Sequence, residues 1–330
     1  MKLIVQIPCL NEEQTIAETI RAIPRTLLGV DSVEVLVIDD GSRDRTAEIA
    51  REAGADHIVS HARNLGLAAG FRTGIDTALR LGADLIVNTD GDHQYRGADI
   101  ATLVQPVLEK RADIVIGDRQ FRAVRQFGPL KTRLQILGSQ VVSSLAGHPV
   151  PDAVSGFRAF SRDAAIRLNI HSRFSYTTET IIQAFNRGMT VVSVPVTTNR
   201  VDRPSRLAGS SLRFIIQQAV IMIRMYAMYR PMRFFFYRGS VFLLAGMIPV
   251  LRFLWFNING AGQGHIQSLV LGAALLGAGF LLLVTGLLSD LIAQNRRLTE
   301  SVLERLKRLE LEGVPDSTAR PGRKEEKKKR

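Results

Sequence analysis

The sequence has one cysteine and one tryptophan in 330 residues, and aromatic residues make up only 6% of it. Because Cys9 is alone, the chain can form no internal disulfide and no zinc site built from several cysteines. The first residues, MKLIVQIPCLNEE, contain an apolar run that is too short for a secretory signal peptide, and they have no small-residue cleavage site. We therefore expect the N-terminal part of the chain to fold in the cytosol.

The usual phosphate-binding loops are missing as well. There is no G-x-x-x-x-G-K-[ST] segment, and the glycines of GLAAGFRTG follow a G-x3-G-x3-G spacing instead of G-x-G-x-x-G. We interpret Gly70 and Gly74 as positions that let a helix pack closely on a sheet. The formal net charge of +12 nevertheless indicates an acidic partner, such as nucleotide phosphates, nucleic acid or an anionic membrane surface.

Up to about residue 117, short β-branched runs alternate with helical patterns. This alternation predicts an α/β domain with a parallel, doubly wound sheet and right-handed crossovers. The predicted strands are KLIVQI, VEVLVID, DHIVS, ADLIVNT and ADIVIG, followed later by VVSVPVT. Ligands of such sheets bind beyond the carboxyl ends of the strands. Five polar residues lie at or just after those ends and predict a site there: Asn11, Asp39, Asp40, Asp90 and Asp92.

The C-terminal part has a different composition. Segments 234–256 and 266–293 each contain the ~20 apolar residues that are needed to cross a bilayer. The linker between them, NINGAGQGH, is short and polar, so we expect a transmembrane hairpin. The preceding segment, 207–233, has the pattern of amphipathic helices in a membrane interface.

Arginines flank both ends of the hairpin, and by the positive-inside rule they place both ends in the cytosol. They are Arg224, Arg230, Arg233 and Arg238 on one side and Arg296 and Arg297 on the other. Beyond the membrane, the second helix is expected to continue before the chain ends in a disordered basic tail. The predicted parts are thus a catalytic domain (1–206), the amphipathic segment, the hairpin (234–293), and a cytosolic helix with its tail (294–330). The hairpin and the cytosolic helix also predict a homo-oligomer.

The stretch DGDHQY places oxygen-bearing side chains at every second position, namely Asp90, Asp92 and Gln94. Two like charges this close repel each other, which favours a cation between them. Hard oxygen ligands suit Mg²⁺ or Mn²⁺, which keep spare positions for phosphate oxygens. Taken alone, a D-x-D motif is also common in surface turns.

The motifs VQIPCLNEE, VLVIDDGSRDRT, RNLGLAAG, NTDGDHQ, GDR and DAVSGFRAFS follow one another in this order. As a set they resemble family 2 of the inverting glycosyltransferases, which have the GT-A fold. More closely, they resemble the polyprenyl-phosphate glycosyltransferases, which include dolichol-phosphate mannose synthases and bacterial undecaprenyl-phosphate sugar transferases. The resemblance covers residues 1–211 and, with the hairpin, extends to about residue 295.

The resemblance implies roles for individual residues. The nucleotide would be held by Pro8, Asn11, Glu12, Asp39, Asp40, Asn64, Gly66, Asp90 and Gly91. The divalent metal, Mg²⁺ or Mn²⁺, would be held on the diphosphate by Asp90, Asp92 and Gln94. The residues placed near the sugar or the acceptor are Ser155, Arg158, Glu179, Arg200 and Arg206. Those assigned to catalysis are Arg119, which would neutralise phosphate charge, and Arg206. Asp152 is a further catalytic candidate that the resemblance does not supply.

The sequence departs from the family pattern at two positions. Arg206 occupies the place of a lysine, and the two side chains are not equivalent because the guanidinium binds two oxygens at once. Thr180, next to Glu179, occupies the place where related enzymes carry a catalytic aspartate. A hydroxyl acceptor would need that base, whereas a phosphate monoester with a second pKa near ~6 is already an anion. The missing aspartate favours a phosphate acceptor, and Asp152 is left as a candidate to position or deprotonate it.

The expected function is transfer of a hexose from a nucleotide sugar, of the UDP-glucose or GDP-mannose class, to undecaprenyl or dolichyl phosphate with inversion. The phosphates and the membrane explain the positive charge without nucleic acid. The alternative is a membrane-bound polysaccharide synthase or another transferase with a hydroxyl acceptor. A processive synthase would usually have more membrane spans and a Q-x-x-R-W-type motif, and the sequence shows neither. A nucleotidyltransferase would need a lysine-bearing glycine-rich first loop, and a non-catalytic membrane scaffold would have no use for the clustered aspartates.

Overall fold

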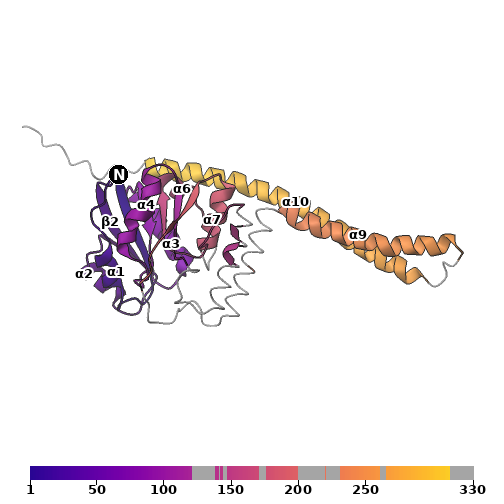
Figure 1. Cartoon of the computed structure of the whole chain (residues 1–330), viewed down its shortest axis with the longest axis horizontal. Helices are drawn as coiled ribbons and strands as arrows, with labels where there is room; N and C mark the ends of the chain where they lie inside the picture. Colours follow the sequence, from indigo (N-terminus) through magenta and orange to yellow (C-terminus); the bar gives the residue numbers. More distant parts are fainter. Residues whose placement is uncertain are drawn as a thin grey trace, which may run out of the picture.

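The structure is a computed structural model that describes residues 1–120, 138–140, 142–143, 147–170, 176–199, 220, 231–260 and 265–312. It consists of an α/β domain and a long two-helix hairpin that projects from one end of that domain (Figure 1). The prediction of an α/β domain followed by an apolar hairpin is therefore confirmed.

Within the described residues, seven strands form one sheet in the order β3-β2-β1-β4-β6-β5-β7. All neighbouring pairs are parallel except the two that involve β6. The strands are β1 (Lys2–Cys9), β2 (Ser32–Asp39), β3 (His57–Ser60), β4 (Leu85–Asn88), β5 (Ile114–Asp118), β6 (Arg158–Ser161) and β7 (Val191–Pro195). The mostly parallel sheet agrees with the prediction. β6 was not predicted, because four residues that begin with an arginine have no recognisable strand pattern.

Helices cover both faces of this sheet. The first four lie where the sequence predicts helices, whereas the last two, between residues 162 and 186, were not predicted. They are α1 (Ile16–Ala22), α2 (Thr46–Glu52), α3 (Leu67–Arg80), α4 (Ile100–Leu108) after a short 3-10 turn η1 (Gly97–Asp99), α6 (Arg162–Arg167) and α7 (Thr177–Asn186). Alternate residues of β1 point to opposite faces. Leu3, Val5 and Ile7 join α1, α2 and α4 in one core cluster, whereas Ile4 joins α3, α6 and α7 in another.

Two glycines bring α3 close to the sheet. A Cβ atom at Gly74 would lie 2.4 Å from Oε1 of Gln6 and 2.8 Å from Cδ1 of Ile38, and one at Gly70 would lie 3.4 Å from Cβ of Pro8. The interpretation of these glycines as packing positions is confirmed. Their effect is to hold the start of α3 beside the carboxyl ends of β1 and β2.

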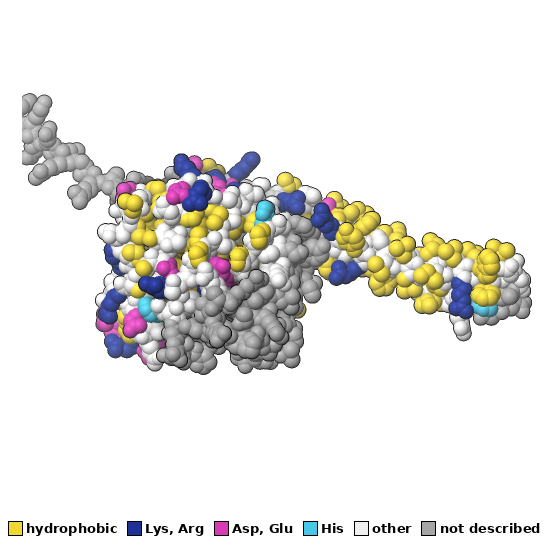
Figure 2. Space-filling view, in the orientation of Figure 1, with side chains coloured by type: hydrophobic (Ala, Val, Ile, Leu, Met, Phe, Trp, Pro, Cys, Tyr) yellow, Lys and Arg dark blue, Asp and Glu magenta, His cyan; other side chains and the backbone are white. Residues whose placement is uncertain are grey.

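The hairpin is formed by α9 (Pro231–Ile258) and α10 (Ile266–Glu312). Among the described residues, these are the two helices that are long and apolar enough to cross a membrane. Their surface is largely apolar, and basic side chains gather near the junction with the domain (Figure 2). Toward the far end of α9, the basic residue is Arg252. The apolar exposed surface indicates membrane association.

A seam of glycines lets the two helices touch through their backbones. These glycines recur every seven residues on each helix and are buried: Gly239 and Gly246 on α9, and Gly272, Gly279 and Gly286 on α10. A Cβ at Gly239 would lie 3.0 Å from the carbonyl oxygen of Gly279, and one at Gly279 would lie 2.9 Å from that of Gly239. Small residues at such contacts allow the close approach on which helix association in lipid depends.

We expect Gly246→Val to destabilise the full-length protein in detergent by about 1–3 kcal/mol, the usual cost of overpacking a close contact. A Cβ at Gly246 would lie 2.8 Å from the backbone nitrogen of Leu276. Gly277→Val is the matched control, because a Cβ at Gly277 meets no atom of the described residues within 4 Å. Thermal unfolding of both variants measures the difference, and equal midpoints would show that the seam does not hold the hairpin together.

Candidate functional site

The site lies at one edge of the sheet, where β2, β1 and β4 end side by side. These three strands are parallel neighbours, so the loops that follow them open at the same edge. The strand ends and the loops after them carry Asn11, Asp39, Asp40, Asp90 and Asp92, as the sequence predicts. Within this edge, Asp39 and Asp40 are almost fully buried, while Asp90 and Asp92 are partly exposed.

The turn that carries Asp90 and Asp92 is held from two sides. The hydroxyl of Thr15, just before α1, shares its one proton between the carbonyl oxygen of Gly91, at 2.8 Å, and the carboxylate of Glu12, at 3.0 Å. Glu12 thereby lies against Gly91, where a Cβ would be 3.5 Å from Cγ of Glu12. Within the turn, the backbone N–H of Gln94 donates to Asp92 over 3.2 Å.

The segment after β7 lies along the other side of the same turn. The backbone N–H of Asn199 donates to the carbonyl oxygen of Gln94 over 2.8 Å, and its side-chain amide donates to that of His93 over 3.0 Å. A β-bridge joins Tyr95 to Thr198. The backbone on both sides of the aspartates is thus fixed before any ligand binds.

The carboxylate of Asp90 fits into a space left by a glycine. A Cβ at Gly156 would lie 2.9 Å and 3.0 Å from the two oxygens of Asp90, and 3.0 Å from the hydroxyl of Tyr176. Below it, the side-chain amide of Asn88 donates to the carbonyl oxygen of Gly156 over 2.8 Å and to the Tyr176 hydroxyl over 2.9 Å. Asn88 in turn accepts a 2.8 Å bond from Gln6.

Burial and the neighbouring charge of Asp92 raise the pKa of Asp90 to about 7, although Arg119 and Arg158 act in the opposite direction. A carboxylate whose ionisation is resisted in this way gains from a nearby cation.

The donor chemistry fits Mg²⁺ or Mn²⁺. Asp90 and Asp92 offer carboxylate oxygens, and the amide of Gln94 follows two positions after Asp92. Mg²⁺ is commonly held by one or two carboxylates together with substrate phosphates. Among the described residues, no three His, Cys, Asp or Glu side chains form a cluster that would enclose a metal by themselves. The site therefore suits a cation that is shared with a phosphate-bearing ligand.

The predicted nucleotide residues around Asp40 come together at the start of α3. One oxygen of Asp40 accepts from the N–H of Leu65 over 2.9 Å and contacts His61 Nδ1 at 2.7 Å, and the other accepts from the N–H of Gly66 over 2.8 Å. Asn64 also accepts from the Gly66 N–H, over 2.9 Å. Asp40 thus ties the loop before α3 to the end of β2.

Gly41 permits this arrangement, because its φ of +75° is rarely adopted by other residues and a Cβ there would lie 2.6 Å from the backbone of Arg63. The remaining nucleotide candidates line the same loops. Asn11, with φ of 53°, accepts from the N–H of Arg43 over 2.8 Å. Asp39 accepts from the N–H of Ser42 over 3.0 Å.

Arg119 and Asp152 form a buried, two-pronged ion pair. Nε and Nη2 of Arg119 donate to the two oxygens of Asp152 over 2.7 Å and 3.0 Å, and the backbone N–H of Arg119 also donates, over 3.3 Å. Asp152 is fully buried, and Arg119 is 9% exposed. Burial opposes the charge of Arg119, but Tyr95, Asp152 and Asp90 together raise its pKa. Asp152 therefore orients a cation, and both of its oxygens are engaged.

The residues assigned to the sugar are less accessible than the sequence suggests. Ser155, Arg158 and Glu179 are at most 1% exposed. The guanidinium of Arg158 donates to the carbonyl oxygens of Ser155, Thr177 and Ala153 over 2.7–2.9 Å and to the hydroxyl of Thr180. Burial lowers its pKa to about 10. In this arrangement the guanidinium of Arg158 is enclosed by its hydrogen-bond partners, so it stabilises the residues around the site and has no exposed surface for a sugar to contact.

Two further candidates, Arg200 and Arg206, lie outside the described residues, as do most of the amphipathic segment and the basic tail. Four other residues of the site were not identified from the sequence: Gln6, His61, Asn88 and Tyr176. The signal for Gln6 and Asn88 was available, because each is a polar residue in an otherwise apolar strand. For His61 and Tyr176 the contacts depend on tertiary structure alone.

Known proteins resemble the chain in sequence. The sequence profile described as glycosyl transferase family 2 matches residues 4–168. Glycosyltransferase AglJ of Haloferax volcanii is 30% identical over 313 residues, which cover 92% of this chain and 95% of that protein. A UDP-N-acetylglucosamine–dolichyl-phosphate N-acetylglucosaminyltransferase of Methanococcus voltae is 29% identical over 214 residues, covering 58% of this chain and 83% of that protein.

The fold is also found among solved structures. Glucosyl-3-phosphoglycerate synthase of Mycobacterium tuberculosis, crystallised with Mn²⁺, UDP and glucosyl-3-phosphoglycerate, superposes with a TM-score of 0.51 at 22% identity, covering 67% of this chain and 79% of that one. At this identity the likeness concerns the fold alone. Together with the family match, it shows that the α/β domain has the GT-A fold.

The raised pKa of Asp90 predicts a pH-dependent stability in the absence of divalent metal. The folded-state pKa of about 7 lies above the unfolded value of about 3.9. The protonated group therefore stabilises the fold fully below pH ~4, and this contribution is lost as the pH rises through ~7. Asp90→Asn should remove this loss of stability. In EDTA at pH 8, the free energy of unfolding of the variant should therefore exceed that of the wild type by roughly 2–4 kcal/mol, as measured by thermal unfolding. The two proteins should converge near pH 4, and a constant difference from pH 4 to pH 8 would contradict the assignment.

Proposed function

The chain belongs to glycosyl transferase family 2 and is a glycosyltransferase, and on that premise we propose that it transfers a hexose from a nucleotide sugar to a polyprenyl phosphate, with inversion. The donor is of the UDP-glucose or GDP-mannose class, and the acceptor is undecaprenyl or dolichyl phosphate. The name of the Methanococcus voltae relative supports this acceptor, since it specifies dolichyl phosphate. The match to AglJ covers nearly the whole chain, and the related part therefore includes the hairpin.

The observation that carries the proposal is the engagement of Asp152 by Arg119. Both oxygens of Asp152 accept hydrogen bonds from the guanidinium, so this carboxylate is not placed to remove a proton from an acceptor. At position 180, the threonine hydroxyl accepts from Arg158 and donates to the carbonyl oxygen of Thr177. Glu179, which is buried, accepts from Gln183 over 3.2 Å. An acceptor that is already an anion at neutral pH requires none of these groups as a base.

The charges at the sheet edge suit a reaction between two phosphate groups. A divalent cation held by Asp90, Asp92 and Gln94 would offset the charge that builds on the departing nucleoside diphosphate. Arg119 is a permanent cation close enough to lower the pKa of Asp90, and it is held in one orientation by Asp152. Arg200 and Arg206 are assigned to the same task from the sequence. Cations fixed in advance stabilise developing negative charge without reorganising during the reaction.

In the proposed step, an oxygen of the lipid phosphate attacks the anomeric carbon of the sugar from the face opposite the diphosphate. The new bond joins that oxygen to the anomeric carbon, while the bond to the diphosphate breaks and its electron pair leaves with the nucleotide. The lipid monophosphate becomes a phosphodiester. The loops around Asp40 and Asn11 hold the nucleotide during this exchange, and the fixed backbone near Asp92 holds the diphosphate.

We also propose that α9 and α10 cross the membrane as a hairpin with the GT-A domain on the cytosolic side. Their apolar length is sufficient, and the arginines near the domain have the distribution of cytosolic flanks. Such a hairpin would keep the protein at the surface where a polyprenyl phosphate presents its head group.

The proposal is tested by incubating the purified full-length protein in liposomes with undecaprenyl phosphate and a panel of UDP- and GDP-sugars. We expect transfer of one sugar with Mn²⁺ or Mg²⁺ and none with EDTA. Asp92→Asn should reduce transfer by at least about 100-fold, the order of effect that the loss of one electrostatic catalytic group produces. Because the substitution also removes the like charge beside Asp90, the thermal midpoint of the variant should be no lower than that of the wild type. Transfer to a hydroxyl acceptor but not to the lipid phosphate would refute the proposed acceptor.

A double-mutant cycle tests whether Asp152 acts through Arg119. We expect Asp152→Asn and Arg119→Lys each to lower kcat by about 10- to 100-fold, because lysine cannot form the two-pronged pair. Since the two residues act as one unit, the double variant should be no slower than the slower single variant. If Asp152 were instead a general base, the losses would multiply, and Asp152→Asn alone would shift the pH profile of kcat.

A further inference from the structure

α10 is one unbroken helix of 47 residues, and its two halves lie in different surroundings. At 1.5 Å per residue it is about 70 Å long. Its first part belongs to the apolar hairpin, whereas residues 294–312 are rich in charge and run along the GT-A domain (Figure 1). The hairpin and the domain are thus connected by a continuous helix instead of a flexible linker.

Ion pairs join residues 294–312 to three helices of the domain. Glu300 accepts from Nη2 of Arg187, at the end of α7, over 2.7 Å. Lys307 donates to Asp76 of α3 over 3.1 Å, and Arg308 pairs with Asp163 of α6. The contacts therefore involve side chains that are up to 231 positions apart in the sequence.

Glu300 is the most enclosed carboxylate of this contact. It is 8% exposed, and it accepts a second 2.7 Å bond from Nε of Arg296 on its own helix. Although burial opposes its ionisation, the bonds from Arg187 and Arg296 lower the pKa of Glu300, so that it is a carboxylate at neutral pH. Arg187 also donates to the carbonyl oxygen of Arg167 and accepts at its own carbonyl from Arg167 over 2.6 Å. This interlocking joins α6, α7 and α10.

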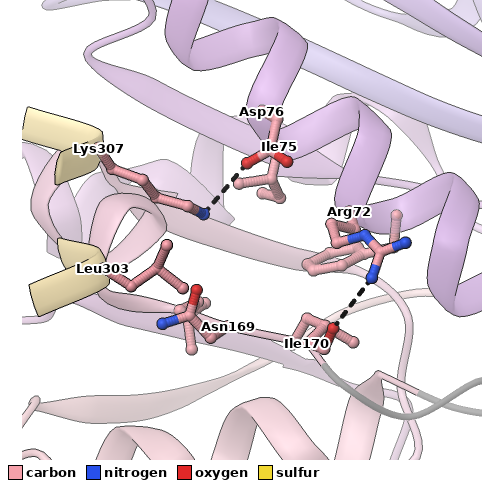
Figure 3. A pocket seen from close by; sticks show the side chains of 9 residues that line it. Arg72, Ile75, Asp76, Asn169, Ile170, Leu303 and Lys307 are labelled. Atoms are coloured by element: carbon pink, nitrogen blue, oxygen red, sulfur yellow. Dashed lines mark hydrogen bonds and ion pairs between the residues drawn. The ribbon is translucent and has the colours of Figure 1, made fainter. Parts of the chain in front are cut away.

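Apolar packing between α10 and the domain is incomplete beside these ion pairs. A cavity of about 190 Å³ lies between α3, the segment 168–170 and α10. Leu303 and Lys307 line it from α10, and the Lys307–Asp76 pair spans one side of it (Figure 3). The contact between α10 and the domain is therefore packed less densely than a protein core, and ion pairs lie beside the cavity.

The helices held by α10 begin at the proposed active site. α3 starts beside Gly66, whose N–H is bound by Asp40, and α7 starts at Thr177, whose carbonyl oxygen is bound by Arg158. α10 contacts α3 at Asp76 and α7 at Arg187, toward the opposite end of each helix. A change in how residues 294–312 of α10 dock on the domain would therefore move the whole site relative to the hairpin.

We propose that residues 294–312 are a rigid arm that fixes the distance and angle between the active site and the membrane, and that Glu300 is the positioning residue that locks this arm to α7. The inference rests on the proposed function, because the bilayer sets the depth at which the phosphate of a lipid acceptor lies. α10 would set the height of the active site above the membrane, and the two must match for transfer. A misplaced site loses rate even when its own geometry is intact.

The test compares two acceptors in the same proteoliposomes: undecaprenyl phosphate in the bilayer and water-soluble citronellyl phosphate. Glu300→Arg, which places a third cation beside Arg187 and Arg296, should lower kcat/KM for the bilayer acceptor about tenfold more than for the soluble one. Glu310→Arg is the matched control, since this glutamate is exposed on the same helix, and its ratio should stay within about twofold of the wild type. If Glu300→Arg left the ratio of the two kcat/KM values unchanged, whether both fell equally or neither fell, the proposal would be overturned.

A second readout does not depend on transfer. Glu52 is exposed on α2 and Cys9 is buried, so Glu52→Cys provides a single accessible labelling site. Energy transfer from this label to a head-group-labelled lipid should broaden or shift in Glu300→Arg and remain unchanged in Glu310→Arg. Unchanged energy transfer in both variants would refute the arm. Failure of the wild type to use either acceptor, combined with altered energy transfer, would refute the proposed acceptor and retain the arm.

Discussion

The repulsion between Asp90 and Asp92 is the constraint around which this edge of the sheet, the proposed nucleotide site, is arranged. The two carboxylates stand one residue apart at the end of a buried strand, where neither is fully hydrated. The backbone of their turn is held by Thr15 on one side and by Asn199 on the other. Gly156 leaves room for Asp90, and the buried cation of Arg119 partly balances the charge. An edge of this kind is stabilised by a ligand that brings positive charge between the acids and negative charge beyond them.

The pair of Arg119 and Asp152 has a different part in this arrangement. A buried ion pair gains little net stability, because removing two charges from water costs about as much as their attraction returns. Its effect here is geometric: the two-pronged contact leaves the guanidinium one orientation, next to the acidic turn. The same contact engages both oxygens of Asp152, which the sequence alone leaves as a candidate base. Under the proposed function, the choice of acceptor thereby depends on an interaction between two loops.

Much of this organisation can be predicted from the sequence, and the remainder has identifiable physical causes. Apolar β-branched runs that end in Asp39 or shortly before Asp90 predict the strands, the edge and the acidic turn, because these signals are local. The strand β6 escapes prediction because it has only four residues and begins with the buried Arg158. The position of Arg158 below the site, and the pairing of Asp152, depend on contacts between separate segments. The docking of Lys307 on Asp76 depends in the same way on how the chain returns to the domain.

The glycine seam of the hairpin has a consequence for how the molecule responds to lipid. Helices whose backbones touch along their length move together, and the longer of them leads without interruption to the GT-A domain. Tilting is one way in which a hydrophobic hairpin adapts to bilayer thickness. In a thinner bilayer the joined pair would tilt further, and this tilt would change the position and orientation of the domain at the membrane surface. Lipid composition would then become a determinant of how well an embedded phosphate meets the sugar donor.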